Sequence, residues 1–129
     1  MLQVVAAIIE RNGEILICQR RPEQSHPLKW EFPGGKVETG ETPQQALSRE
    51  LEEELAICDA AGVEIARYEF SYPGKSPILL LFYRVQTFRG EPQNRVFRQM
   101  RWEPPARLGE FDFVEGDRDF LAGFCKQAI

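Results

Sequence analysis

The stretch GGKVETGETPQQALSRELEEELAI, residues 34–57, constrains the fold of this chain more than any other segment. Thr42 supplies a hydroxyl cap for a helix, Pro43 suits its first position, and Gln45 can close a capping box. Glycines precede these residues, and leucines recur at helical spacing after them. The segment therefore predicts a loop that leads into a helix beginning near Pro43.

The predicted helix has an apolar stripe and an acidic edge. At about 100° of rotation per residue, three leucines share one stripe that would pack on a core: Leu47, Leu51 and Leu55. Glu50, Glu53 and Glu54 fall beside this stripe, while Glu52 points to the far side. A solvated acidic face is the plainer interpretation of such a run of charge.

The position of the glutamates argues for a second interpretation. Glu52, Glu53 and Glu54 lie in the last turn, where the helix dipole disfavours each anion by ~0.3–1 kcal/mol. Glu50 repels two of them, an effect that Arg49 with Glu53 partly offsets. A bound divalent cation would reverse the sign of these terms. Magnesium suits clustered carboxylates that leave room for water and substrate phosphate oxygens.

The spacing of these residues forms a motif. Gly35 is followed by five residues and Glu41, then by seven residues and Arg49-Glu50-Leu51, one residue, and Glu53-Glu54. This spacing resembles the signature of the Nudix hydrolases. The family's glycine after the glutamate pair is Ala56 here, followed by the aliphatic Ile57. Because that glycine ends the helix in a left-handed turn, the alanine affects the cap and leaves the metal-binding positions untouched.

The resemblance implies a role for each residue of the motif. Glu50, Glu53, Glu54 and the carbonyl of Gly35 would bind magnesium or manganese, Arg49 would orient a glutamate, and Glu41 would support the loop or a further metal. The implied catalytic residues are Glu53, Arg49 and Glu50. Hydrolysis of a pyrophosphate linkage with metal ions needs no covalent nucleophile, and the scattered cysteines and serines offer none.

Apolar patterns predict strands on both sides of the motif. Residues 4–9 and 15–19 are predicted to be strands on the two sides of the hairpin dipeptide Asn12-Gly13. Further strands are predicted at 63–72, at 78–88 and, as a short one, at 99–102. A final helix is predicted at 117–127. Strands that alternate with two helices indicate a mixed sheet between helical layers. This α/β fold agrees with the α/β/α sandwich that the Nudix resemblance implies, and 129 residues predict a single domain, 1–129.

Composition limits the partners of the chain. A net charge of -4 argues against a nucleic-acid polymer as partner. No apolar run reaches ~18 residues, and MLQVVAAIIE lacks the features of a signal peptide. We therefore expect a cytoplasmic protein without membrane contact, a monomer or weak homodimer. The three cysteines favour a reducing compartment, and His26, the only histidine, is interpreted as structural or incidental.

Within the family, the segment EFPGGKVETGETPQQAL is most similar to MutT-like enzymes. These cleave nucleoside triphosphates to the monophosphate and pyrophosphate, and they include DNA-repair sanitisers of oxidised nucleotides such as 8-oxo-dGTP. The resemblance implies a (deoxy)nucleoside triphosphate as substrate. Two alternatives stay open: a Nudix hydrolase of another nucleoside diphosphate derivative, such as a nucleotide sugar, and a non-catalytic nucleotide-binding domain, which would predict erosion of the glutamates.

Four further residues are candidates for substrate binding. Arg20 and Arg21 end a predicted strand and either hold a phosphate or a base edge, or only add charge there. By position in the MutT group, Glu115, with Asp117 close by, would read the base, since a carboxylate accepts from N–H groups of guanine or cytosine. The alternative is a helix cap by Asp117 and acidity in the first turn that suits the helix dipole. MutT-like proteins often carry a loop glutamate where this chain has Val96, which leaves the general base open.

Overall fold

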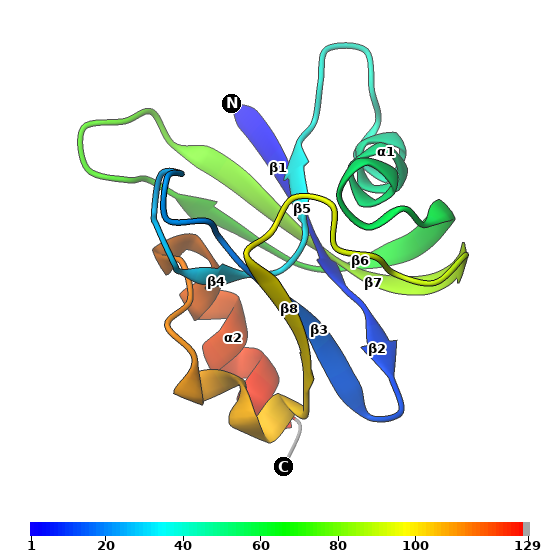
Figure 1. Cartoon of the computed structure of the whole chain (residues 1–129). Helices are drawn as coiled ribbons and strands as arrows, with labels where there is room; N and C mark the ends of the chain where they lie inside the picture. The colour runs from blue at the N-terminus through cyan, green and yellow to red at the C-terminus, as the bar shows by residue number, and fades with distance from the viewer. Residues whose placement is uncertain (128–129) are drawn as a thin grey trace.

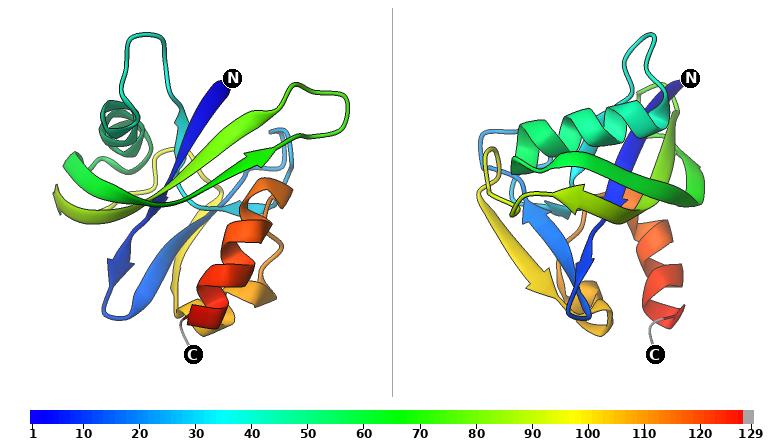
Figure 2. Two further views of the ribbon diagram at one scale, coloured as in Figure 1. Left: turned by 180° about the vertical axis from the view of Figure 1, so that it is seen from behind. Right: turned by 90° about the vertical axis from the view of Figure 1, so that its right-hand side faces the viewer.

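A computed structural model describes residues 1–127 of the chain. Its elements are β1 (Leu2–Ile8), β2 (Glu10–Arg11), β3 (Glu14–Gln19), β4 (Trp30–Glu31), β5 (Gly34–Lys36), α1 (Pro43–Leu55), β6 (Cys58–Phe70), β7 (Ile78–Arg89), β8 (Gln99–Glu103), a short 3₁₀ helix (Pro105–Glu110) and α2 (Glu115–Gln127). Helices α1 and α2 lie on opposite sides of the strands (Figures 1 and 2). This arrangement confirms the predicted α/β fold with helices on both sides of a mixed sheet.

The strands form two sheets. The mixed sheet has the order β5-β1-β7-β6, in which β1 and β7 are parallel and the other neighbours antiparallel. The second sheet joins β2, β3, β4 and β8 through antiparallel pairs. Strand β1 therefore sits at the centre of the mixed sheet, and β5 brings the glycine pair Gly34-Gly35 to its edge.

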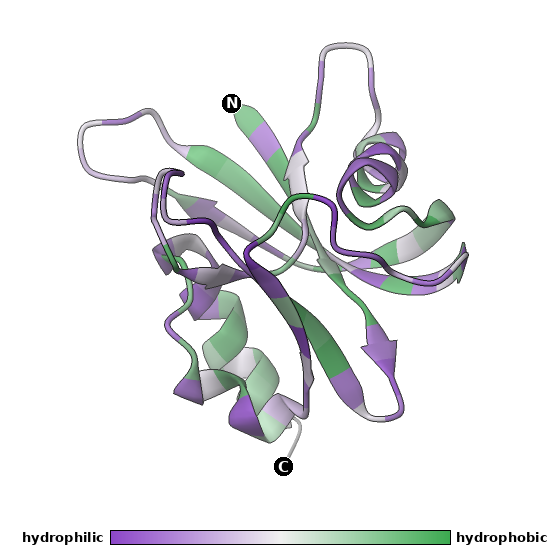
Figure 3. Ribbon diagram, viewed as in Figure 1, coloured by the Kyte–Doolittle hydropathy of each residue, from purple (hydrophilic) through white to green (hydrophobic). Residues whose placement is uncertain are grey.

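Strand β1 supplies both hydrophobic cores, because successive side chains of a strand point to opposite faces. Val5 and Ala7 pack in the core under α1, whereas Ala6 and Ile8 pack in the core under α2. In Figure 3 hydrophobic residues run along β1, β3 and β7, while α1 is mostly hydrophilic on its outer side. The continuous apolar run at the start of the chain is thus explained by a strand that is covered on both faces.

Helix α1 begins and ends as its sequence predicts. The capping box is present: Gln45 N donates to Thr42 Oγ1 at 3.1 Å, and Thr42 N donates to Gln45 Oε1 at 2.9 Å. The predicted leucine stripe is fully buried. Ala56 follows the helix with φ 60°, in the left-handed region, and its N–H donates to Glu52 O. The left-handed turn that the family builds with glycine is therefore built here with alanine.

Strand β6 differs most from its prediction: it begins at Cys58 instead of residue 63 and ends at Phe70 instead of residue 72. Its first residues pair with the far end of β7 through register shifts, so they show no regular alternation. Gly62 lies so close to β7 that a Cβ there would be 2.4 Å from Arg84 O. The 3₁₀ helix after β8 was not predicted.

Two features are absent from the described residues: a helix that could span a membrane and a disulfide bond. No helix among residues 1–127 is long and apolar enough to cross a membrane. The three cysteines, Cys18, Cys58 and Cys125, are free thiols.

The left-handed conformation of Ala56 yields a stability prediction. Ala56→Gly removes the steric cost of a Cβ at positive φ, so it should raise the free energy of unfolding by up to about 1 kcal/mol. Urea denaturation measures the change. Ser48→Gly, in the middle of α1, is the matched control and should lower the same quantity by about 0.5–1 kcal/mol. A loss of stability in Ala56→Gly would contradict the assigned cap.

Candidate active site

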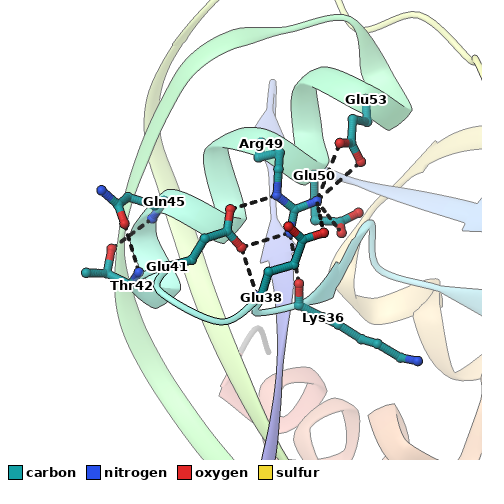
Figure 4. Close-up of polar contacts among 8 residues, drawn as sticks. All are labelled: Lys36, Glu38, Glu41, Thr42, Gln45, Arg49, Glu50 and Glu53. Carbon is teal, nitrogen blue, oxygen red and sulfur yellow. Dashed lines mark hydrogen bonds and ion pairs between the residues drawn. The ribbon is translucent and has the colours of Figure 1, made fainter.

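The guanidinium of Arg49 organises the acidic side of α1 (Figure 4). Its Nε and Nη2 donate to the two oxygens of Glu41 at 2.7 and 2.9 Å. Its Nη1 donates to Glu50 Oε1 at 2.9 Å and reaches Glu53 at 3.3 Å. Nη2 also donates to the carbonyl of Lys36 at 2.9 Å. One side chain therefore joins the loop after β5 to two glutamates of the helix.

Hydrogen bonds hold the side chain of Glu41 in the loop after β5. Besides both bonds from Arg49, Glu41 Oε1 accepts from Glu38 N at 2.9 Å. Hydrogen bonds from Arg49 and from Glu38 N–H lower the pKa of Glu41 to about 2. The hydrogen bond to Glu41 in turn raises the pKa of Arg49. Of its two predicted roles, support of the loop is the one that these contacts favour.

The glycine pair of β5 lies directly against the glutamates. A Cβ on Gly35 would be 2.4 Å from Glu50 Cδ, so any larger residue would displace the Glu50 carboxylate from its place. Gly34, with φ 156°, would place a Cβ 2.0 Å from the carbonyl of Val5 in β1. Its N–H donates to Glu54 Oε1 at 3.0 Å. Both glycines thus allow the edge of the sheet to touch the acidic side of α1.

Glu54 places a carboxyl group at a half-buried position. Burial raises its pKa to about 8, a hydrogen bond from Gly34 N–H opposes the shift, and the charges of Glu31, Glu50 and Glu53 add to it. Burial also raises the pKa of Glu50 in spite of Arg49. The carboxyls of Glu50 and Glu54 therefore resist ionisation at this edge, and a bound cation would favour their charged forms.

The donor atoms fit a hard divalent cation. Carboxylate oxygens and the Gly35 carbonyl are the ligands that magnesium and manganese prefer. Within residues 1–127, no three Asp, Glu, His or Cys side chains converge closely enough to form a preassembled metal site. Arg49 Nη1 occupies oxygens of both Glu50 and Glu53. Metal binding through Glu50, Glu53 and Glu54 therefore requires their carboxylates to turn, and it stays a prediction.

A cavity of about 320 Å³ adjoins this edge. Gly34, Gly35, Lys36 and Glu54 line one part of it. Asp117, at the start of α2, lines it as well. The cavity therefore connects the glutamate edge with the N-terminal end of α2, and a ligand with a charged and an uncharged part could reach both.

The four predicted substrate residues lie in different surroundings. Arg20 lines the cavity and donates to Glu31 Oε1 at 3.0 Å. Arg21 is exposed outside the cavity lining, and its Nε donates to Val96 O at 2.9 Å. Glu115 is exposed and does not line the cavity, whereas Asp117 is buried and does. The structure brings Arg20 and Asp117 together in one cavity wall and leaves the other two outside it.

Asp117 does not cap α2, but it lies with Glu115 in the first turn, where their negative charge was expected to face the helix dipole. Helix α2 begins at Glu115, two residues before the predicted start at 117. The Asp117 carboxylate instead accepts from the N–H of Phe32, a residue far away in sequence, at 3.3 Å. Burial raises the pKa of Asp117 to about 7, against the hydrogen bond from Phe32 N–H.

Sequence reasoning missed Glu31 as a site residue. It lies between the buried Trp30 and Phe32, lines the cavity and pairs with Arg20. Burial raises its pKa, while Arg20 lowers it. A charged residue between two buried aromatic residues, directly before the glycine pair, was the available indication.

Comparison with known proteins gives consistent matches over most of the chain. A family model described as "NUDIX domain" matches residues 1–124. The chain is 38% identical over 124 residues to CTP pyrophosphohydrolase of Escherichia coli (strain K12), covering 96% of this chain and 91% of the relative. It is 44% identical over 103 residues to 8-oxo-dGTP diphosphatase of Haemophilus influenzae, covering 79% and 75%. A MutT structure, from a study of Aliivibrio salmonicida and Vibrio cholerae, is 32% identical, with a TM-score of 0.80 over 98% of both chains.

The raised pKa of Asp117 predicts a pH dependence of stability. Between about pH 4 and 7 the unfolded chain releases this proton while the folded chain keeps it, so the free energy of unfolding falls as pH rises through this window. Asp117→Asn should remove the part of this fall that Asp117 contributes, while the raised pKa values of Glu54 and Glu50 keep their own contributions. Relative to the parent, the variant should gain about 2–4 kcal/mol between pH 4 and pH 8.

Urea denaturation at both pH values measures this gain. Asp119→Asn, an exposed change on the same helix, is the control and should leave the parental slope unchanged. A constant offset between Asp117→Asn and the parent at all pH values would contradict the buried, protonated carboxyl.

Proposed function

This chain belongs to the Nudix family, and on that premise we propose that it hydrolyses a (deoxy)nucleoside triphosphate to the monophosphate and pyrophosphate with magnesium. It is a MutT-like Nudix hydrolase, as its motif indicates. One observation carries the proposal: Arg49 bonds Glu41, Glu50 and Glu53, and Gly34 bonds Glu54, which lines the adjoining cavity.

Hydrolysis of a phosphoanhydride needs charge neutralised on the phosphoryl oxygens, a positioned water and a stabilised leaving phosphate. Glu50, Glu53, Glu54 and the Gly35 carbonyl would hold the divalent cation, which supplies this neutralisation and lowers the pKa of a water. Arg49 limits the positions of Glu50 and Glu53 through bonds of 2.9 and 3.3 Å. Its bonds to Glu41 anchor the guanidinium itself.

The loop that carries Val96 is fixed to the end of α1. Gln93 N donates to Leu55 O at 2.8 Å, and Arg95 N donates to Glu54 O at 3.1 Å. The guanidinium of Arg95 donates to Glu52 O at 3.1 Å, so it also satisfies a carbonyl of the last turn. Position 96 is therefore near the glutamates, yet valine cannot accept a proton.

We assign the acceptance of the proton from water to Glu53. Among the three glutamates that accept hydrogen bonds from Arg49, Glu53 is the most accessible, with 58% of its side chain exposed against 15% for Glu50 and 18% for Glu41. A base must reach the proton that it removes. As an exposed carboxylate among the metal-binding positions, Glu53 meets this condition without a loop glutamate.

The position of Asp117 favours a substrate whose nucleobase carries an amino group. It lies in the cavity wall away from the sequence motif, and its carboxyl can accept or donate a hydrogen bond near neutral pH. Cytosine and guanine both present a donor next to an acceptor. The two relatives named for CTP and 8-oxo-dGTP differ in base, so we propose this shared edge as the feature recognised. The net charge of -4 favours free nucleotides over a nucleic-acid polymer as the ligand. We also propose that the protein is cytoplasmic and is a monomer or weak homodimer.

A substrate panel tests the function. CTP, dCTP, dGTP, 8-oxo-dGTP and nucleotide sugars are incubated with the protein and magnesium, and products are resolved by ion-exchange chromatography. We expect monophosphate and pyrophosphate from at least one triphosphate, and no turnover without divalent metal. Release of diphosphate and phosphate, preferred cleavage of a nucleotide sugar, or no cleavage of any compound would refute the proposal.

Val96→Glu tests the assignment of the base. If Glu53 and the metal suffice, the substitution should change turnover by less than about 10-fold, or ~1.4 kcal/mol. Val96→Gln introduces a side chain of the same shape as glutamate but without a titrating group, so it serves as the matched control. A silent parent that Val96→Glu alone activates would show that a loop glutamate is the required base.

A further inference from the structure

Two loops meet at the mouth of the cavity. One loop joins β3 to β4 and carries His26. The other joins β6 to β7, and Tyr72 is its second residue. The loops lie side by side in Figures 1 and 2. The rings of His26 and Tyr72 are in contact, with centroids 4.7 Å apart and an interplanar angle of 36°. Both residues line the cavity.

Tyr72 is held firmly in this position. Its ring packs edge-on against Phe70, with centroids 4.7 Å apart. Its hydroxyl lies against Gly116 in the first turn of α2, where a Cβ on Gly116 would be 3.3 Å from the Tyr72 hydroxyl oxygen. Because Asp117 is the next residue, the Tyr72 ring lies beside the carboxyl that we propose to read the base edge.

His26 is held less firmly. It is exposed, and its backbone has φ 51°, a left-handed conformation that a non-glycine residue seldom adopts. Tyr72 is its aromatic contact among the described residues. His26 therefore covers a face of Tyr72 from a solvent-exposed loop, and neither ring contributes to the two hydrophobic cores.

The position of this ring pair is that of a nucleobase subsite. If the phosphates bind beside Gly35 and Glu54, the rest of a nucleotide extends along the cavity toward Asp117 and Tyr72. A base is flat and aromatic, and stacking on an aromatic side chain stabilises it by ~1–3 kcal/mol. With centroids 4.7 Å apart, the two rings leave no space for a base between them.

We propose that Tyr72 is the stacking platform for the nucleobase and that the base displaces the His26 ring from it. This inference rests on the proposed function, since it needs a nucleotide in the cavity. It makes the two residues opposite in effect: Tyr72 adds binding energy, whereas His26 competes with the ligand for the same face. His26 then contributes to specificity, because a base that stacks weakly does not displace it.

The test measures binding of the product-like probes CMP and GMP to the whole protein by calorimetry, so it does not need turnover. Tyr72→Leu should weaken CMP or GMP binding by about 10-fold, within the range expected for one stacked base. Tyr72→Phe keeps the ring and should change binding by less than about threefold. His26→Ala should tighten binding by about threefold. Ribose 5-phosphate, which lacks a base, should bind all variants as it binds the parent.

Three outcomes would overturn the inference. Tyr72→Leu with parental affinity for CMP and GMP would exclude stacking. Equal losses in Tyr72→Leu and Tyr72→Phe would show that only the hydroxyl group matters. Weaker binding by His26→Ala would show that His26 contacts the base instead of competing with it. If the parent fails to hydrolyse any triphosphate while these shifts occur, the proposed function is wrong and the nucleobase subsite stands.

Discussion

The ion-pair network of Arg49 is the interaction on which the site depends. A helix that places glutamates at four of its last six positions carries repulsion that its own backbone cannot relieve. Arg49 offsets this repulsion with a bidentate bond to Glu41 and with bonds to Glu50 and Glu53. It uses the same guanidinium to hold the carbonyl of Lys36. The loop and the helix are thereby kept in one relative position.

The fold supplies the surface against which this network works. Gly34 packs on the backbone of β1, and Gly35 admits the carboxylate of Glu50. The buried leucines of α1 hold the helix over the same sheet. Strand β1, covered on both faces, is therefore the support for the acidic edge on one side and for the start of α2 on the other. The cavity lies between these two features.

Local patterns in the sequence predict the helix and the motif, and long-range contacts decide the rest. Thr42, Gln45 and the leucine stripe act within one or two turns, so the bounds of α1 were predictable. The early start of β6 depends on pairing with residues of β7 more than twenty positions away, and Asp117 finds its partner in Phe32. No local sequence pattern predicts the contact of His26 with Tyr72 either. For this reason the lone histidine was interpreted as structural or incidental.

The central claim is that the Arg49-bound glutamates of α1 carry the hydrolysis. Its most direct test is the turnover of a nucleoside triphosphate by Glu53→Gln beside Glu52→Gln at saturating magnesium. Both residues are exposed in the last turn of α1, but Glu53 is bonded to Arg49, whereas Glu52 lies on the other side. The account predicts a loss of about 100-fold or more for Glu53→Gln, equivalent to ~3 kcal/mol, and less than about threefold for Glu52→Gln. Equal turnover in the two variants would contradict it.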